Sequence, residues 1–543
     1  MSNKKPILAL IALILLAAQS AATVAFAAPA QVVFNPTQGE PRDYRVGVRV
    51  QPEDGGDGSN SRGEWLALQS VMRYRVSAGG LMSTTHIEPR FMQAENESGP
   101  LFSSARGDDL EDTSIPRLMR DGFDLAMDRD GKSTRPGNSN REAWQAVADK
   151  SGVPVSQLEQ QLVAPALAQT IPARQGAQLA IDGFQGMPTL RLTVTEVDSD
   201  SLIATLTRTD DVPRPPQPMS DTRDSTSTRV THVDGRLRID RDSGWIQAMT
   251  LISDRQIERT GGTTRLHSVV TMEAVDDPAT GTMGDGLREF RTNAMSAAMP
   301  DYDMYLPETA EDTLDRPVIE PPTQPLAHAE TGFHIDEDGA LVLNITHRDD
   351  ENVSLDQLAL DALTLRDADG KTLDQGFVLD SIAPDHEQDD ATRIRLLPLG
   401  WQAPDPGDIA EVEASVTYQP INAPRYVSLP LRDTPTRLDN GVAHAEAVPT
   451  DDGWLVSLTG GYNTYYTYGL NTVFKGRSAT TTNRARDGIN FADRILLERV
   501  DDPDIWGLQF ELTGDIDAFD LMFYSPAEPS THALTFTRDA PER

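Results

Sequence analysis

Five short motifs occur twice, in the same order, in the second half of the chain, and this duplication constrains the fold more than any other feature. AHAE begins each copy, at residues 327–330 and 443–446. DG-x-LV, GDI and Y-x-P follow, and RD-x-P closes each copy. The offset between matching motifs falls from 116 for AHAE (443 − 327) to 106 for Y-x-P (524 − 418). This order indicates a duplicated structural unit, at residues 327–435 and 443–541.

Each copy shows short runs of alternating apolar and polar residues, separated by turn residues. About seven such runs in roughly 105 residues predict an immunoglobulin-like β-sandwich for each copy. The DG-x-LV motifs predict equivalent buried positions for Leu341 and Leu455. The turns DRDG, DEDG and DADG, at residues 128–131, 336–339 and 367–370, favour hairpins. The alternative is a calcium loop, which needs a set of oxygen ligands ending in an acidic twelfth residue that none of the three supplies.

Residues 43–275 predict a separate N-terminal domain of the α+β class. Two segments, 141–150 and 156–168, have apolar residues at helical spacing and are expected to cover one face or end of a sheet. The clearest strands lie between residues 172 and 275, where alternating runs follow one another through turns and one longer proline-rich loop. That arrangement is typical of an antiparallel meander.

The meander resembles a group of uncharacterised secreted bacterial proteins over residues 172–275. The resemblance rests on Pro172 and Gly176 at its entry, on the paired strands, and on a hairpin with Asp240 and Ser243-Gly244 at its turn. It implies a curved antiparallel sheet or half-barrel with an apolar concave face. The resemblance brings no functional residues with it.

Residues 276–326 are rich in Pro, Asp, Ala and Thr and end in the sequence RPVIEPPTQP. Adjacent prolines stiffen a chain into an extended spacer, so we expect a linker here. The expected fold class is therefore mainly β with a small helical insert. A curved antiparallel sheet with two helices would come first, followed by two tandem β-sandwich domains.

The first 27 residues have the features of a secretory signal peptide. Lys4 and Lys5 precede an unbroken apolar run, and small residues then allow cleavage after residue 27 or residue 30. The alternative is an uncleaved membrane anchor, for which the continuous apolar run is short of the ~20 residues needed. The sequence thus predicts export to the periplasm or the exterior, with no membrane span after cleavage. The chain has no Cys, which excludes disulfides and thiolate metal sites.

The chain is strongly acidic, with a formal charge of −36, or −38 once Lys4 and Lys5 are removed with the signal. Only six Lys occur, so Arg supplies most of the positive charge. Such a surface repels nucleic acid. Acidic, Lys-poor surfaces also suit salty surroundings, because counter-ions screen the self-repulsion. We therefore expect a salt-adapted protein of a cell envelope.

A cluster of tyrosines is the one unusual local feature, and it lies where the two copies differ most. Its members, set among Gly, Asn and Thr, are Tyr462, Tyr465, Tyr466 and Tyr468. Tyrosines with small polar neighbours form good contact surfaces for a glycan or a protein. The alternative is that their rings fill the core of the second sandwich.

No catalytic, metal-binding or cofactor-binding motif is visible. The nine His residues are scattered, and neither a phosphate loop nor a nucleophile elbow occurs. The leading hypothesis is a non-enzymatic envelope protein that acts as a binding or interaction module. The second is a periplasmic carrier that holds an apolar ligand in the concave N-terminal sheet, and the third is a hydrolase of envelope polymers.

Overall fold

The computed structural model describes most of the chain outside its first 30 residues, and every structural statement below concerns the described part. Its ranges are residues 31–35, 37–53, 65–79, 82–96, 99–105, 122–128, 133–134, 145, 166–167, 169–182, 184, 187–209, 217–218, 227–259, 262–282, 326, 329–337, 339–346, 357–374, 376–384, 391–399, 408–419, 425–439, 443–461, 466–469, 478–481, 489–514, 516–523 and 528–539. The fold is mainly β, as the alternation predicted, and the helix it contains is α7 (Phe491–Glu498). The expected signal peptide, most of both expected helices and most of the expected linker fall outside these ranges.

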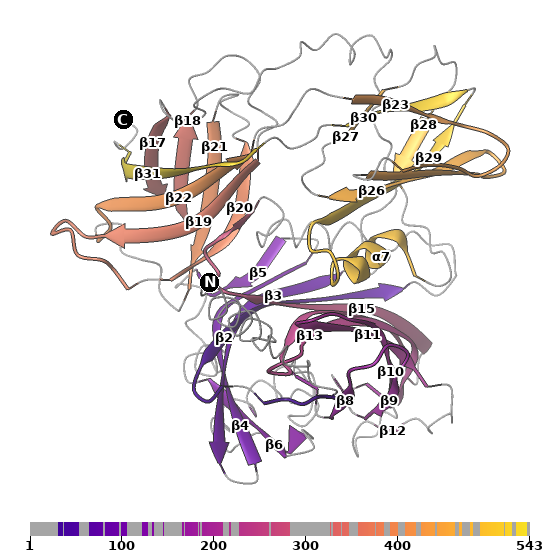
Figure 1. Cartoon of the computed structure of the whole chain (residues 1–543), viewed down its shortest axis with the longest axis horizontal. Coiled ribbons are helices and arrows are strands. Elements are labelled where there is room, and N and C mark those ends of the chain that lie inside the picture. Colours follow the sequence, from indigo (N-terminus) through magenta and orange to yellow (C-terminus); the bar gives the residue numbers. More distant parts are fainter. Residues whose placement is uncertain are drawn as a thin grey trace, which may run out of the picture.

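The N-terminal part forms one long antiparallel sheet, strongly curved and nearly closed into a barrel-like shape (Figure 1). Its order is β7-β6-β4-β3-β2-β15-β14-β13-β11-β10-β9, with β5 paired to β4 and β12 to β13. The strands are β2 (Pro41–Glu53), β3 (Leu66–Gly79), β4 (Met82–Asn96), β5 (Gly99–Ser103), β6 (Phe123–Asp128), β7 (Ser133–Thr134), β9 (Gln178–Ile181), β10 (Leu190–Val197), β11 (Ser201–Arg208), β12 (Gln217–Pro218), β13 (Ser227–Asp240), β14 (Ile246–Arg259) and β15 (Gly262–Val275). The expected meander of residues 172–275 is present, and its last strand, β15, pairs along its length with β2 from the start of the N-terminal part.

The two faces of this sheet have different partners. The inner face carries a hydrophobic core that includes Leu192, Leu237 and Leu251, all fully buried. A small sheet of β1 (Gln31–Val32) and β8 (Ile171–Pro172) adds side chains to the same core. The outer face is covered by the C-terminal half of the chain.

The turn between β13 and β14 is built as the sequence predicted. Asp240 Oδ1 accepts hydrogen bonds from the backbone N–H (2.7 Å) and the hydroxyl (2.7 Å) of Ser243. Gly244 has φ +74°, and a Cβ there would lie 2.7 Å from the carbonyl oxygen of Val33. Only glycine allows both that conformation and that close approach.

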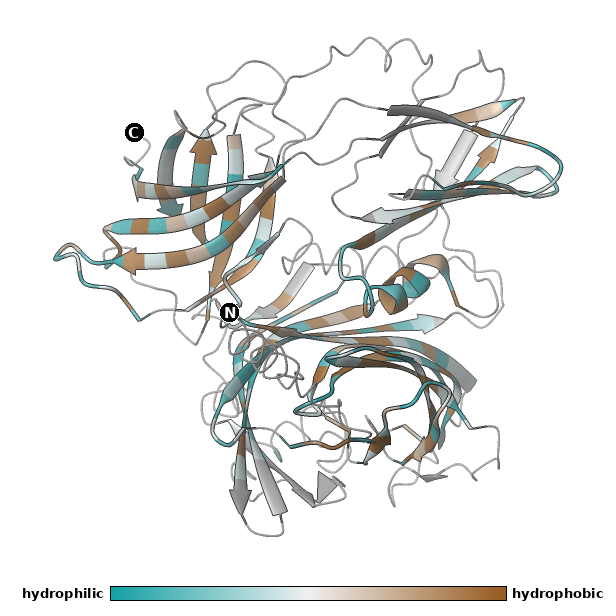
Figure 2. Ribbon diagram, viewed as in Figure 1, coloured by the Kyte–Doolittle hydropathy of each residue, from teal (hydrophilic) through white to brown (hydrophobic). Residues whose placement is uncertain are grey.

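The first C-terminal unit is an eight-stranded sheet in the order β16-β19-β22-β31-β17-β18-β21-β20. Its strands are β16 (Gly281–Thr282), β17 (Glu330–Ile335), β18 (Leu341–Thr346), β19 (Gln357–Arg366), β20 (Phe377–Pro384), β21 (Ala391–Pro398), β22 (Glu411–Gln419) and β31 (Ser530–Arg538). Hydrophobic and hydrophilic residues alternate along several of these strands (Figure 2). The inward-facing residues of both halves of the sheet share one core, so the sheet folds over on itself.

The second C-terminal unit has two sheets around another core, in the orders β24-β25-β26-β29-β28 and β23-β30-β27. Its strands are β23 (Arg425–Pro430), β24 (Thr436–Asp439), β25 (Ala443–Pro449), β26 (Gly453–Gly461), β27 (Tyr466–Gly469), β28 (Ser478–Thr481), β29 (Ile505–Thr513) and β30 (Ala518–Phe523). The helix α7 lies between β28 and β29 in the chain.

The described strands of the two sequence copies correspond one to one, with a mutual exchange of the last strand. In the first copy β17 pairs with β18, β18 with β21, β21 with β20, and β19 with β22. The second copy repeats this pattern with β25, β26, β29, β28, and with β27 and β30. The last strand of each copy, however, pairs with the other copy: β31 with β22, and β23 with β30. Residues 327–435 and 443–541 therefore each lack one strand of their own core.

The expected equivalence of Leu341 and Leu455 is wrong, because Leu341 is fully buried whereas Leu455 is only half-buried. Five residues separate the paired positions Ile335 and Leu341 in the first copy, at 336–340. Four residues, 450–453, separate the paired Pro449 and Trp454 in the second. A change of one residue turns a strand's side chains to the opposite face. Trp454 therefore takes the place of Leu341.

Candidate functional site

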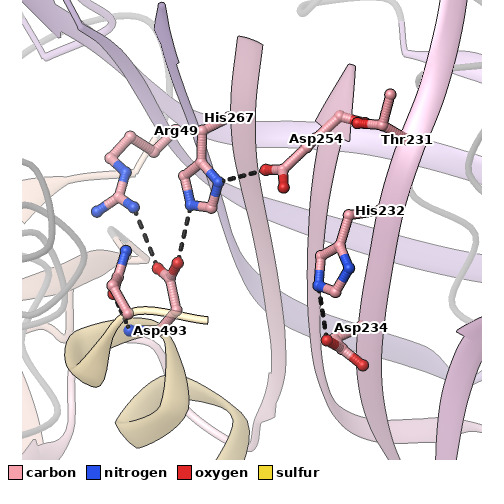
Figure 3. A network of polar contacts seen from close by, with 8 residues as sticks. Arg49, Thr231, His232, Asp234, Asp254, His267 and Asp493 are labelled. Atoms are coloured by element: carbon pink, nitrogen blue, oxygen red, sulfur yellow. Dashed lines mark hydrogen bonds and ion pairs between the residues drawn. The ribbon is translucent and has the colours of Figure 1, made fainter. Parts of the chain in front are cut away.

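A polar network lies where α7 meets the outer face of the N-terminal sheet. Here β13, β14 and β15 run side by side, and His232, Asp254 and His267 are cross-strand neighbours. Residues two apart on a strand share a face, and the inner core takes the alternate positions. These three polar side chains therefore project from the outer face, and Figure 3 shows His267 directed at Asp493 of α7, Asp254 at His267, and His232 at Asp234.

The helix supplies the central carboxylate. Asn490 caps α7, and its side-chain oxygen accepts a hydrogen bond from the backbone N–H of Asp493 at 2.8 Å. That cap places Asp493 in the first turn, where the partial positive charge of the helix stabilises a carboxylate. The side chain of Asp493 is fully buried.

Asp493 joins two cations from two neighbouring strands (Figure 3). Arg49 Nη2 lies 3.3 Å from its Oδ1, and His267 Nε2 lies 2.8 Å from its Oδ2. On its other side, His267 Nδ1 lies 2.7 Å from Asp254 Oδ1. With His267 protonated, the network holds two positive and two negative charges and is neutral as a whole.

The surroundings favour the protonated form of His267. Burial lowers the pKa of His267, but the hydrogen bonds to Asp254 and Asp493 outweigh burial and raise the pKa to about 9. For Arg49, burial is the largest effect and lowers the pKa, while the charge of Asp493 opposes it. Arg49 thus depends on Asp493 for its counter-charge, whereas His267 has both Asp254 and Asp493.

This arrangement fastens the helix to the sheet and occupies both ring nitrogens of His267. A general base needs a free ring nitrogen within reach of a substrate, and both nitrogens of His267 face carboxylates. No Ser, Thr or Lys side chain is recorded in contact with the four charged groups among the described residues.

Further contacts hold α7 and the turn after it on the same face. The Thr250 hydroxyl donates to the carbonyl oxygen of Leu496 at 2.8 Å. Arg236 Nε donates to Asp501 Oδ1 at 2.8 Å, and Arg238 donates to the Asp501 carbonyl oxygen. Leu496 packs in a small apolar cluster with Ile252 and its cross-strand neighbour. Polar and apolar contacts therefore fix the position of the helix together.

A second pair lies beside the network on the same face. His232 Nε2 lies 2.7 Å from Asp234 Oδ2, with both side chains partly exposed. Burial is the largest effect on Asp234 and raises its pKa, while His232 opposes the shift. The pair makes no recorded contact with His267 or Asp493.

The first C-terminal unit contacts the outer face mainly through apolar side chains. Val71 and Phe91 of the N-terminal sheet form one apolar cluster with Val378 and Leu397. Nearby, Arg45 Nη2 donates to the carbonyl oxygen of Thr280 at 3.2 Å. The expected linker thus begins with residues that pack between the two parts.

The predicted tyrosine site is only partly within the described residues. Tyr466 and Tyr468 belong to β27, where they pair with Phe523 and Leu521 of β30. Tyr462 and Tyr465 lie outside the described residues, as do the side chains of the other two. The structure therefore places two members on an outer strand of the β23-β30-β27 sheet, remote in sequence from the residues of the polar network.

Two of the Asp-Gly turns are hairpins, as predicted. Asp367 Oδ1 accepts hydrogen bonds from the backbone N–H groups of Asp369 (3.0 Å) and Lys371 (2.8 Å). Asp336 Oδ1 accepts in the same way from the N–H of Ala340 at 2.9 Å. The DRDG turn lies mostly outside the described residues.

Comparisons with known proteins give no family for this chain: no family model and no curated protein matches it. Among solved structures, a protein provisionally assigned as AttH from Nitrosomonas europaea is 10% identical, with a TM-score of 0.13, over 88% of this chain and 93% of its own. OpdQ of Pseudomonas aeruginosa is 7% identical, with a TM-score of 0.11, over 92% and 98%. Likenesses this weak carry no argument about fold or function. Within the described ranges, no helix has the length and apolarity of a membrane span.

Proposed function

We propose that this chain is an exported protein of the cell envelope that acts as a non-enzymatic binding or interaction module. Its finer architecture would be an N-terminal α+β domain followed by two tandem immunoglobulin-like sandwiches. One observation carries the proposal. The buried group of titratable side chains around Asp493 fastens α7 to the sheet, and both ring nitrogens of His267 face carboxylates there.

The contact surface in this proposal is the tyrosine cluster, and its partner is a protein or an envelope glycan. The supporting observation is its place on β27, at the outer edge of the β23-β30-β27 sheet. Among the described strands β27 pairs with β30 alone, and Tyr466 and Tyr468 are two of its four residues.

A carrier of an apolar ligand is the second candidate. It is favoured by half-buried apolar side chains on the inner face of the N-terminal sheet, among them Val48, Val50 and Leu266. These residues are not part of the packed inner core.

The test presents the purified mature protein to immobilised envelope polysaccharides and cell-wall polymers. Binding is followed by interferometry and released products by chromatography. We expect saturable binding without soluble products, weakened at least about tenfold when Tyr465 and Tyr466 are both replaced by Ala. The matched control replaces Tyr302 and Tyr305, a tyrosine pair in the expected linker, and should bind as the wild type does.

Each other outcome selects a different function. Soluble products released from a polymer would overturn the proposal in favour of a hydrolase. A small molecule found by native mass spectrometry in the absence of polymer binding would replace the module with the carrier.

A further inference from the structure

The inner face of the N-terminal sheet has an open apolar patch, formed by Val50, Pro52, Leu66 and Leu266. Cross-strand pairing places Leu66 beside Val50, and Leu266 beside Pro52. Leu66 is 46% exposed and the other three are half-buried, unlike the packed core deeper in the sheet. Neighbouring strands lie about 4.8 Å apart, so the face from β3 to β14 extends for about 15 Å.

Arg255 borders this patch on the same face, as the cross-strand partner of Leu266. Among the described residues no carboxylate pairs with it. Its Nη2 contacts Met187 Sδ at 3.8 Å, and its Nε is buried without a hydrogen-bond partner. Burial lowers the pKa of the guanidinium. A mostly buried cation is costly unless an anion accompanies it.

A second cation, Arg208, lies on β11, and the strand β13 separates it from β14 and Arg255. Arg208 Nη1 donates to the backbone carbonyl oxygens of Val230 (3.0 Å) and Thr231 (2.9 Å), and Val230 is the other cross-strand partner of Arg255. Neither Arg has a recorded carboxylate partner in the described part. In the whole chain, 84 acidic residues outnumber 48 basic ones, so carboxylates are abundant. Two cations so placed on one face, neither with a carboxylate partner, are therefore unexpected in this chain.

We propose that this end of the inner face binds an amphipathic anion, an apolar chain or ring that ends in a carboxylate. The carboxylate lies against Arg255 and Arg208, and the apolar part covers the open apolar patch. Guanidinium groups bind carboxylates through paired, charge-assisted hydrogen bonds. The inference rests on the second candidate function, the carrier, and deepens it by naming a site and a ligand class.

The test uses calorimetry on the full mature chain with three probes: decanoate, decanol and acetate. Decanoate has both parts of the proposed ligand, decanol lacks the charge, and acetate lacks the chain. We expect saturable binding of decanoate, at least about tenfold weaker binding of decanol, and no saturation with acetate.

Variants then separate the two halves of the site. Arg255→Met keeps an unbranched apolar stem without the guanidinium and should weaken decanoate at least about tenfold while leaving decanol unchanged. Leu66→Ser should weaken both decanoate and decanol. The matched control is Arg265→Met, an exposed arginine of β15 whose position faces the opposite side of the sheet, and it should change nothing.

The inference is overturned if decanoate fails to saturate the wild type, or if Arg255→Met binds it unchanged. Thermal melting of each variant shows whether the fold is intact. If Arg255→Met is unfolded, Arg255→Lys replaces it and should bind decanoate more weakly than the wild type. Failure here with intact polymer binding would leave the proposed module standing, whereas the reverse result would remove the module and keep this site.

Discussion

His267 lies between two carboxylates that come from parts of the chain more than two hundred residues apart. Asp254 is on the neighbouring strand, and Asp493 is brought by a helix from the second sequence copy. Breaking such a buried pair costs far more than replacing it whole by apolar residues, because the remaining charge has no partner. The network is therefore selective for one docked position of α7.

The stabilisation from His267 should depend on pH. The folded pKa of about 9 lies above the ordinary value of 6.5, so the contribution is complete below pH 6.5 and is lost as the pH rises through about 9. Its upper bound is about 3 kcal/mol. We expect the difference in free energy of unfolding between the wild type and His267→Gln to shrink by about this amount between pH 6.5 and pH 10. Urea unfolding at both pH values measures it, and an equal difference at both would show that His267 is neutral in the folded protein.

Removing the shared carboxylate should be more damaging than removing an exposed one nearby. Asp493→Asn leaves Arg49 buried without a counter-charge and leaves His267 with Asp254 alone, which should cost about 3–5 kcal/mol of stability. The control is Asp502→Asn in the turn after the helix, where the exposed carboxylate should contribute within about 0.5 kcal/mol. Equal losses for both variants in chemical unfolding would contradict the structural role of Asp493.

The polar network could be found from the sequence only in part. His232, Asp254 and His267 lie on strands that the alternation predicted, and pairing those strands through their hairpins would have placed the three side by side. Asp493 could not be singled out, because one carboxylate among 84 acidic residues is not diagnostic. Its importance comes from burial, which depends on where α7 packs.

At the scale of the elements, the strands were predictable and their partners were not. Alternation located most of the strands because a half-buried strand needs it. The helix α7 was missed, although Asn490 followed by Asp493 at the third helical position is a capping signal and Phe491, Ile495 and Leu496 share one face. Two of the four predicted contact residues, Tyr466 and Tyr468, fall on a strand.

The exchange of β23 and β31 could not be predicted from the sequence, and the reason is physical. The last strand of a copy, β23 or β31, pairs with the sixth strand of a copy, β22 or β30. The two copies are similar enough for either sixth strand to accept either last strand. Local alternation is identical in both arrangements. Only the connections, residues 420–424 and 524–529, decide which partner is reached, and their sequence carries no pattern that specifies the direction.

Because the chain has no Cys, a single introduced pair can test the exchange. Ser415 of β22 and Ala533 of β31 are cross-strand partners. Partners across an antiparallel pair have Cα atoms about 4.5–5.5 Å apart, which a disulfide spans. We expect Ser415→Cys with Ala533→Cys to form a disulfide quantitatively on oxidation, seen by peptide mapping. The control, Ser415→Cys with Ser428→Cys of β23, should stay reduced, and a bond in that pair instead would mean that the strands are not exchanged.

At the scale of the molecule, both C-terminal units pack on the outer face of the N-terminal sheet. The first C-terminal unit sits on an apolar cluster around Val71 and Phe91, whereas the second is held through α7 and its ion pairs. The sequence predicted three parts in a row joined by a linker. It could not predict that they pack together, because such contacts join single residues distant in the chain and follow no periodic pattern.

The charge of the whole molecule should make its stability depend on salt. The formal charge of −36, or −38 without the expected signal peptide, repels itself at low ionic strength, and the Debye length falls from ~30 Å at 0.01 M to ~8 Å at 0.15 M. We expect the thermal midpoint to rise over that range. Melts in sodium chloride measure it, and a flat or falling midpoint would contradict the expectation.

The exchange of strands determines when, during synthesis, the first C-terminal unit can complete its fold. Strands β17 to β22 leave the ribosome early, yet the gap between β22 and β17 is filled only by β31, at residues 530–538. Domains commonly fold as they emerge, N-terminal first, but this unit must wait for the last strand of its neighbour. Until then the early strands remain an incomplete template with two open edges, at risk of pairing with other chains. A chain that stops before residue 530 leaves the first unit without the strand that completes its core.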